Sequence, residues 1–207
     1  VLGNHDRHRI ASRVGPAQAR VAAMLLLTLR GTPTIYYGDE IGMRDVPIPP
    51  DRVQDPWEKN LPGRGLGRDP ERTPMQWSAE PGAGFTSGEP WLPLAGDFGA
   101  VNVAAQRVDP ASMLTLHRAL LDLRRREPAL SVGDWAPVDA DGDVLAWLRS
   151  HGASRFLIAL NLGPEPASLD FAGSGEIVLS TLPDAEPARV GGTIELRGDE
   201  GVIVRLD

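Results

Sequence analysis

The chain has 207 residues, 42% of them hydrophobic and 24% charged, which is the composition of a folded globular protein and not of a disordered one. Its formal charge of −7 argues against a nucleic-acid partner, because binding phosphate groups needs a concentrated basic surface. The absence of cysteine excludes disulfides, thiolate metal sites and cysteine nucleophiles, and no apolar run approaches the roughly 20 residues that span a bilayer, so no membrane partner is expected.

The first residues form an apolar stretch that runs into a polar turn, Asn4-His5-Asp6. Because this apparent strand end lies so near position one, and no initiator Met precedes it, we expect the chain to be the C-terminal part of a larger protein. A proline in the first turn and a glycine after the last predict a helix over residues 16–30, and residues 32–37 predict a strand. This order predicts a βαβ unit with Asn4-His5-Asp6 and Gly38-Asp39-Glu40 on one face, at the C-terminal ends of parallel strands.

Residues 45–107 form a long segment with little periodicity. Loops of this length inside compact domains are usually functional or disordered. Recurrent arginines and three tryptophans, Trp57, Trp77 and Trp91, favour an ordered segment. We therefore predict a binding loop.

A second helix is predicted after Asp109-Pro110, which has the pattern of a helix start. An apolar stripe at helical spacing follows, formed by Met113, Leu116, Leu120 and Leu123. The next three residues, Arg124-Arg125-Arg126, suit a helix C-terminus. We interpret these arginines as a solvated helix end.

After residue 128 the pattern changes to short β-type runs separated by Gly, Pro, Asp and Ser, at the spacing of an antiparallel β-sandwich. The predicted strands cover residues 144–148, 155–161, 167–171, 176–180, 193–197 and 202–206. We place a domain boundary near residue 130, which gives a first domain over residues 1–129 and a second over residues 130–207. The turns of the second domain carry no obvious site.

The adjacent His5 and Asp6 are the strongest candidates for chemistry. A carboxylate and an imidazole at a strand end can bind a metal, transfer protons, or hydrogen-bond a polyhydroxylated ligand, and they can also form a purely structural turn. Metal binding is the weakest of these interpretations, because a site needs three or four convergent ligands and His8 belongs to the same turn. We therefore predict no metal.

Three motifs together resemble one known family. Residues 4–15 are similar to the fourth conserved region of the alpha-amylase family, glycoside hydrolase family 13, in the form found in alpha-glucosidases and oligo-1,6-glucosidases. Residues 31–43 are similar to that family's eighth barrel strand, and residues 67–77, with Arg-Thr-Pro-Met-Gln-Trp, resemble the loop that marks its exo-acting glucosidase branch. The resemblance implies an α/β plus all-β fold: the C-terminal portion of a TIM (β/α)8 barrel, with its last two strand-helix units and a long loop, then an antiparallel β-sandwich.

The resemblance also assigns roles to residues. Asp6 takes the place of the family's third carboxylate, which stabilises the oxocarbenium-like transition state, and His5 that of a histidine that binds sugar hydroxyls. Arg72 matches an arginine that closes the pocket, with Arg68 as the alternative, although a loop-bracing salt bridge would also account for Arg72. Arg9 matches an arginine on the aglycone side.

The implied function is that of a retaining glycoside hydrolase, without a cofactor, that cleaves α-linked glucose from maltose- or isomaltose-type oligosaccharides. Such an enzyme needs a nucleophilic carboxylate and a general acid about 5 Å apart. No stretch here matches those motifs or supplies the family's partner for Arg72, so we expect the chain alone to be inactive and, with unpaired barrel strands, prone to associate. Asp39 and Glu40 are expected to form structural hydrogen bonds. A cysteine-free chain fits a reducing compartment, and we expect the cytoplasm.

Other functions remain open. A transglucosylating isomerase of the trehalose synthase or sucrose isomerase type shares the Arg-Thr-Pro-Met-Gln-Trp loop, although Arg7-His8-Arg9 is more typical of glucosidases. A non-catalytic carbohydrate-binding or scaffold homologue, like the ancillary subunits of some amino-acid transporters, usually loses the Asn-His-Asp motif, which is intact here. A lectin would use Trp135 and Trp147 as stacking platforms, but two tryptophans in a small sheet are more typical of a core. The sequence predicts neither the linkage preference nor the oligomeric state.

Overall fold

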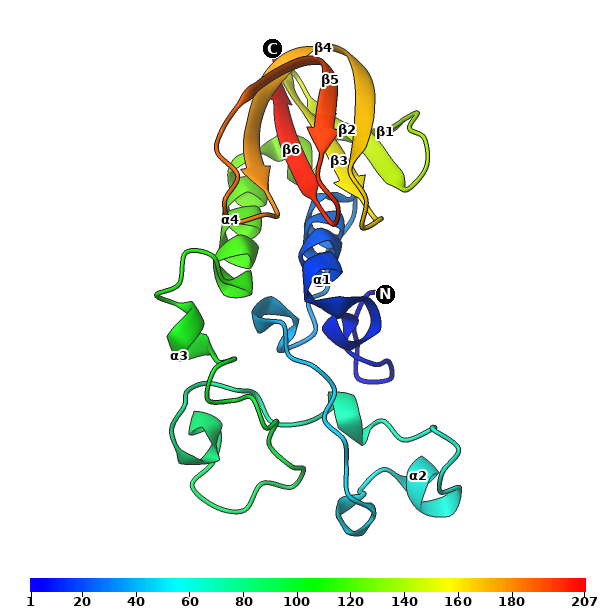
Figure 1. Cartoon of the computed structure of the whole chain (residues 1–207), viewed down its shortest axis with the longest axis vertical. Coiled ribbons are helices and arrows are strands. Elements are labelled where there is room, and N and C mark those ends of the chain that lie inside the picture. Colours follow the sequence, from blue (N-terminus) through cyan, green and yellow to red (C-terminus); the bar gives the residue numbers. More distant parts are fainter. The chain divides into compact units, whose positions relative to one another are not determined.

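The computed structural model describes residues 1–207, with helices up to residue 131 and an antiparallel sheet after it (Figure 1). The helices are α1 (Ile10–Thr28), α2 (Pro56–Asn60), α3 (Val103–Gln106), α4 (Met113–Arg126) and α5 (Pro128–Ser131), with short 3-10 helices at Asp39–Ile41, Pro50–Arg52, Asp69–Glu71 and Pro81–Gly84. The strands are β1 (Asp134–Val138), β2 (Val144–His151), β3 (Ser154–Asn161), β4 (Ala167–Ser180), β5 (Arg189–Leu196) and β6 (Gly201–Leu206). None of the helices has the length together with the apolar character needed to cross a membrane.

The chain folds into two compact units. The first unit consists of Val1–Pro16 with Ile35–Thr115, and the second of Ala17–Thr34 with Leu116–Asp207. The candidate site residues all belong to the first unit, and the whole sheet belongs to the second. The predicted domain boundary near residue 130 stays a prediction.

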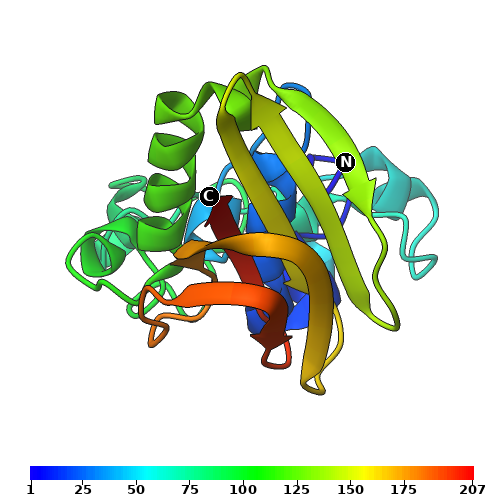
Figure 2. The same ribbon diagram turned by 90° about the horizontal axis from the view of Figure 1, so that it is seen from above.

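The second unit is built on one six-stranded sheet in the order β1-β2-β3-β6-β4-β5, in which every neighbouring pair is antiparallel. This confirms the predicted antiparallel all-β segment. The two strands expected over residues 167–171 and 176–180 are parts of the single strand β4, which curves along its length (Figure 2) and shifts register between Asp170 and Ser174. β1 is missing from the predicted strands because Pro137 lies inside it. The proline is tolerated there because β1 is an edge strand that pairs only with β2.

The bent sheet encloses its own core. Val144 and Ala146 of β2 belong to the same buried cluster as Ile194 and Leu196 of β5, although β3, β6 and β4 separate these two strands in the sheet. The two halves of the sheet therefore face each other, as the layers of a sandwich do. Trp147 lies in β2 and is 1% exposed, so its ring is not accessible for stacking on a sugar. Of the two tryptophans that the lectin interpretation needs, only Trp135 is exposed.

Helix α1 bends at Gly15, whose φ of 81° and ψ of 165° interrupt the helix. The predicted helix over residues 16–30 corresponds to the part after this bend, and the turn from Ile10 was not predicted. The buried face after the bend carries Met24, which lies against the sheet. A Cβ atom added to Gly201 of β6 would stand 3.0 Å from Met24 Sδ, so the missing side chain at this position lets helix and strand approach.

Two buried arginines cap the C-terminus of α1. The last carbonyls of a helix have no partner inside it. Arg124 of α4 donates to three carbonyls in this region and Arg149 of β2 donates to a fourth; the acceptors are Leu27 at 2.9 Å, Leu29 at 3.1 Å and Gly31 at 2.5 Å for Arg124, and Thr28 at 2.5 Å for Arg149. Burial lowers the pKa of both guanidinium groups. The prediction of a solvated helix end is therefore wrong for Arg124, whereas Arg125 and Arg126 are exposed as expected.

Helix α4 begins later than Asp109-Pro110 predicts. Ser112 Oγ accepts a hydrogen bond from the backbone N–H of Thr115 at 3.1 Å, as an N-cap does. Asp109 instead accepts from the backbone N–H of Ala111 at 2.9 Å and closes the turn before the helix. The apolar stripe is confirmed, because Met113, Leu116, Leu120 and Leu123 are all buried.

The first unit contains no β-strand, and the predicted strand over residues 32–37 is also absent, so the predicted βαβ unit is not formed. A parallel strand exists only through hydrogen bonds to a neighbouring strand, and neither segment has such a partner within residues 1–207. The one isolated bridge joins Asn4 and Arg7.

The long segment over residues 45–107 contains only short helices, and hydrogen bonds from side chains as well as backbone groups hold the rest of it. Gln76 Nε2 donates to the carbonyl of Val101 at 2.6 Å, and Asn102 Oδ1 caps α3 by accepting from the backbone N–H of Ala105 at 2.8 Å. Both polar side chains are buried, so these bonds fix the chain where no sheet or long helix does.

Candidate active site

The polar turn at the start of the chain presents Asp6 to solvent. Asn4 Oδ1 accepts a hydrogen bond from the backbone N–H of Asp6 at 3.0 Å, and the backbone N–H of Arg7 donates to the Asn4 carbonyl at 3.4 Å. This is the local side-chain-to-backbone turn expected for Asn. It holds the Asp6 side chain outward, 44% exposed, with His5 Nε2 3.3 Å from Asp6 Oδ2.

Two arginines from the long loop converge on Asp6. Arg68 Nη1 donates to Asp6 Oδ1 at 2.9 Å, and Arg72 Nη2 donates to the same oxygen at 3.1 Å. Arg72 Nε also donates to the backbone carbonyl of His5 at 2.8 Å. Four of the five residues singled out in the sequence, His5, Asp6, Arg68 and Arg72, therefore lie together. We call them the Asp6 group.

The surroundings of Asp6 keep it ionised. Its hydrogen bond from Arg68 lowers the pKa of the carboxyl group, and the positive charges nearby act in the same direction, while slight burial opposes them. A carboxylate held by two arginines on one oxygen, with its side chain 44% exposed, is a fixed negative charge available to a ligand.

Arg68 is itself anchored by a buried carboxylate that the sequence did not single out. Arg68 Nε donates to Asp55 Oδ2 at 2.7 Å, and the Arg68 backbone N–H donates to the same oxygen at 2.9 Å. The hydrogen bond from Arg68 lowers the pKa of Asp55 to about 2. Asp55 also caps α2 through the backbone N–H of Trp57 at 2.9 Å. The Asp-Pro pair that opens α2 is the signal that could have identified this cap.

Two depressions adjoin the Asp6 group. One, of about 380 Å³, is lined by Asp6 and Arg68 together with Trp57, whose residue is 54% exposed. The other, of about 460 Å³, is lined by Arg72, Glu40 and an aromatic set formed by Tyr37, Trp77, Phe85 and Trp91. An aromatic face beside charged hydrogen-bonding groups suits a ligand with one apolar face and several hydroxyls.

Arg9 lies apart from the Asp6 group. Its side chain is buried, donates from Nη1 to the Tyr37 carbonyl at 2.6 Å, and lies over the rings of Tyr36 and Tyr37 at 5.1 and 4.8 Å from their centroids. Arg9 therefore packs in the interior of the first unit and does not contact the Asp6 group. A Cβ atom on Gly38 would stand 2.7 Å from Arg9 Nη1, so Gly38 leaves room for the guanidinium group.

Asp39 and Glu40 differ from the expectation of structural hydrogen bonding. Asp39 Oδ1 and Glu40 Oε2 are buried without a hydrogen-bond partner. Burial raises the pKa of Asp39 to about 6, with Arg9 lowering it and Glu40 raising it further. Asp39 packs against the backbone of Gly3, where an added Cβ atom would stand 2.3 Å from Asp39 Oδ2.

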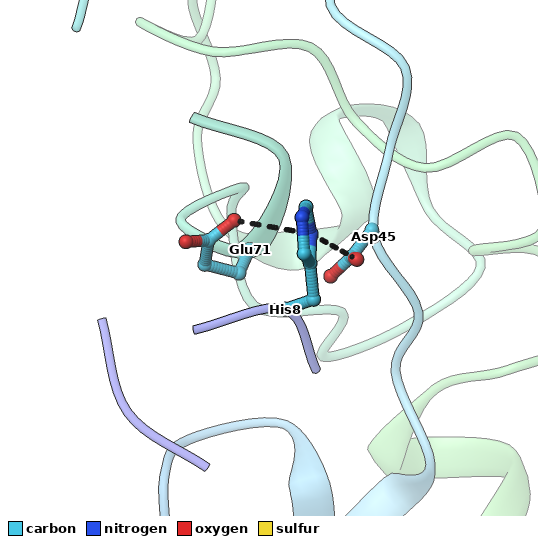
Figure 3. A group of neighbouring side chains, drawn as sticks. All are labelled: His8, Asp45 and Glu71. Carbon is cyan, nitrogen blue, oxygen red and sulfur yellow. Dashed lines mark hydrogen bonds and ion pairs between the residues drawn. The ribbon is translucent and has the colours of Figure 1, made fainter. Parts of the chain in front are cut away.

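A second cluster of titratable side chains lies beside the Asp6 group and was not predicted. His8 Nδ1 is 2.8 Å from Asp45 Oδ2 and 3.9 Å from Glu71 Oε2, and Figure 3 shows the two carboxylates on either side of the imidazole ring. The three residues are far apart in the sequence and carry no shared motif, so only the fold reveals their proximity.

Comparisons with known proteins place the chain in a family. A family model described as "Alpha amylase, catalytic domain" matches residues 1–133, and a model of a domain of unknown function, DUF3459, matches residues 133–203.

Among curated proteins, a "Probable alpha-glucosidase" of Rhizobium meliloti is 37% identical over 173 residues, which cover 81% of this chain and 31% of the relative. A "Salivary alpha-glucosidase" of Anopheles gambiae is 39% identical over 198 residues, covering 91% of the chain and 33% of the relative. An "Amino acid transporter heavy chain" of Rattus norvegicus is 33% identical over 215 residues, covering 99% of the chain and 30% of the relative. The chain thus spans about a third of the length of these relatives.

Among solved structures, the trehalulose synthase MutB from Pseudomonas mesoacidophila matches with a TM-score of 0.85 at 31% identity, covering 100% of this chain and 42% of that one. A MutB mutant in complex with glucose matches with a TM-score of 0.88 at 31% identity and the same coverage. Both matches cover the whole of this chain, including residues 1–37, where the predicted barrel strands form no strand hydrogen bonds.

Proposed function

The chain belongs to the alpha-amylase family, and from this premise we propose that it supplies the sugar-holding part of an α-glucosidase site, with Asp6 as the transition-state-stabilising carboxylate. The observation that carries the proposal is the Asp6 group. It holds an ionised, half-exposed carboxylate on two arginines, in a depression that Trp57 also lines, and its Arg72 borders the aromatic-lined depression.

The charge of Asp6 suits the chemistry of glycoside hydrolysis. The sugar ring flattens and becomes positive in the transition state, so a fixed carboxylate binds it more tightly there than in the ground state. Arg68 and Arg72 hold Oδ1, so Oδ2, whose only ion-pair partner is the exposed His5 at 3.3 Å, is the oxygen that would accept from sugar hydroxyls. His5 lies on that side and would donate to a hydroxyl group.

The arginines have a second use in this proposal. A guanidinium group presents several N–H donors in a fixed plane, which matches a carboxylate and a pair of neighbouring hydroxyls at once. Arg72 uses only Nε and Nη2 for hydrogen bonds to His5 and Asp6, and it also lines the aromatic depression. We assign it to closing the pocket around the terminal glucose. Arg68, which Asp55 anchors, positions Asp6.

Hydrolysis needs two further carboxylates. A retaining glycosidase uses a nucleophile and a general acid, and we propose that both come from the part of the relatives' length that this chain does not span. The substrate class in this proposal is an oligosaccharide with an α-linked terminal glucose. No cofactor enters the mechanism.

A second candidate is a sucrose-converting isomerase, which the match to trehalulose synthase favours. Both activities need a glucose-binding carboxylate, so the Asp6 group fits either. They differ in whether water or the released sugar attacks the glucosyl intermediate. The third possibility, a scaffold like the transporter heavy chain, predicts no turnover.

Product analysis separates the three candidates. The full-length gene product would be incubated with maltose, isomaltose and sucrose, and the sugars would be separated by anion-exchange chromatography. Release of free glucose from maltose or isomaltose supports the α-glucosidase. Conversion of sucrose mainly into an isomeric disaccharide supports the isomerase, and no turnover of any substrate, with the protein folded by circular dichroism, overturns the enzymatic proposal.

A further inference from the structure

The cluster of His8, Asp45 and Glu71 brings one imidazole and two carboxylates from three segments to one point (Figure 3). One ligand atom of each residue lies within 4.8 Å of the others. His8 follows the Asp6 turn, Asp45 begins the long segment, and Glu71 ends a 3-10 helix. All three belong to the first unit.

Glu71 is the unusual member of this cluster. Its side chain is 2% exposed, yet Oε2 has no hydrogen-bond partner and lies on the side of His8. An ionised carboxylate without a partner is expensive to bury. The buried oxygen therefore lacks the donor or cation that its position calls for, and His8 Nδ1 lies 3.9 Å from it.

We propose that His8 Nδ1, Asp45 Oδ2 and Glu71 Oε2 bind one divalent metal ion. The ion would supply the missing positive charge beside Glu71 and would replace the proton between His8 and Asp45. This inference does not depend on the proposed glycosidase function.

The distances fit an ion after a small adjustment. Nitrogen and oxygen ligands lie about 2.1 Å from an ion such as Zn²⁺, so two ligand atoms of one ion can be at most about 4.2 Å apart. The 2.8 Å between His8 Nδ1 and Asp45 Oδ2 suits neighbouring positions around an ion, and the 3.9 Å to Glu71 Oε2 lies within the limit. The ligand atoms of all three residues lie within 4.8 Å of one another, so bringing the set within the limit needs a movement of at most about 0.6 Å. His8 is the exposed member and leaves the remaining coordination positions to water.

The donor set indicates which ions bind best. Imidazole nitrogen favours first-row transition metals, whereas Ca²⁺ and Mg²⁺ prefer sites made entirely of oxygen. One nitrogen and two carboxylate oxygens therefore favour Zn²⁺ or Mn²⁺ over Ca²⁺. The other oxygen of Asp45, Oδ1, accepts from the backbone N–H of Arg9 at 2.9 Å, which fixes the orientation of this carboxylate.

The position of the site gives it a structural consequence. His8 is two residues from Asp6, and Glu71 is next to Arg72. An ion bound to both would join the turn that carries Asp6 to the loop that carries its arginine. Metal binding would therefore stabilise the Asp6 group.

Isothermal titration of the purified protein with ZnCl₂, and separately with MnCl₂ and CaCl₂, tests the proposal. We expect one saturable site for Zn²⁺ or Mn²⁺ and weaker binding of Ca²⁺. His8→Ala, Asp45→Asn and Glu71→Gln should each weaken the binding at least about tenfold. The matched control His151→Ala removes an exposed histidine of the second unit and should leave the affinity unchanged.

The outcomes are decisive in both directions. Absence of a saturable site for Zn²⁺ and Mn²⁺, tightest binding of Ca²⁺, or an equal loss in the control would overturn the proposal. If Glu71→Gln fails to fold, the titration of His8→Ala, a change at an exposed side chain, replaces it. Nuclear magnetic resonance of the wild type gives a second, independent measurement. There Zn²⁺ should shift the Nδ1 signal of His8, and a shift at the other histidines with none at His8 would contradict the site.

Discussion

Replacement of Arg124 by Met tests the capping of helix α1. Arg124 is buried and donates to four backbone carbonyls, those of Leu27, Leu29, Gly31 and Leu130. Methionine keeps a long unbranched side chain with high helix propensity but offers no donor. The variant therefore isolates the hydrogen bonds from the packing.

The expected loss follows from those four bonds. If the buried carbonyls of Leu27 and Leu130 each cost about 1.5 kcal/mol without their donor, and the part-buried carbonyls of Leu29 and Gly31 about 0.5 kcal/mol each, the total is about 4 kcal/mol. Removing a buried charge returns part of this, since desolvating a guanidinium group is unfavourable. We expect the free energy of unfolding to fall by about 2 to 3 kcal/mol, which is a change of about 30- to 150-fold in the unfolding equilibrium.

Urea unfolding followed by circular dichroism measures this loss. With a slope of about 2 kcal/mol per M, the midpoint should fall by about 1 M. Arg125→Met is the matched control, because Arg125 is the next residue of the same helix and its side chain is 82% exposed. Its midpoint should barely change, since an exposed ion pair contributes little. Equal midpoints for Arg124→Met and the wild type would refute the capping argument.

Two further substitutions test the packing and electrostatics of the first unit. Gly38→Ala should lower the free energy of unfolding by about 2 kcal/mol or more, because φ is 87° and the new Cβ atom would stand 2.5 Å from Met43 Sδ. The control Gly63→Ala, at a φ of 73° with no atom near the new Cβ, should lower it by only about 1 kcal/mol in the same urea titration. Equal losses in the two variants would contradict the steric argument. Burial raises the pKa of Asp39 to about 6, above the model-peptide value of 3.8. Between these two pH values the folded chain therefore holds a proton that the unfolded chain releases. The free energy of unfolding should fall as pH rises through this window. Asp39→Asn should flatten that part of the stability profile measured by urea titration from pH 4 to pH 7, and an unchanged slope would show that Asp39 does not titrate there.

The sequence predicted what depends on local patterns. The apolar stripe of α4 and most strands of the sheet follow hydrophobic periodicity, which burial reproduces. The motifs around Asp6 and Arg72 lie more than sixty residues apart, and family resemblance alone linked them. In the structure their side chains are 3.1 Å apart.

The rest could not be predicted because it depends on long-range contacts. Arg124 looks like its two neighbours in sequence, and only the carbonyls at the end of α1 make it a buried cap. Glu71 belongs to the recognised loop, but its relation to His8 and Asp45 appears only once three segments meet. The match of residues 1–133 to the alpha-amylase catalytic domain supports the predicted partial barrel, but its two strands form no strand hydrogen bonds within residues 1–207. A parallel strand is defined by a neighbour that a single segment cannot specify.

The most direct test of the central claim is the kinetics of Asp6→Asn in the full-length gene product, assayed on the α-glucoside substrate that the product analysis identifies. Asparagine keeps the shape of Asp6 and removes its charge, so kcat should fall at least about a hundredfold while KM changes much less. Asp51→Asn, at an exposed carboxylate in the same unit, should retain wild-type kinetics. A kcat for Asp6→Asn within a fewfold of the wild type would contradict the assignment of Asp6 to the transition state.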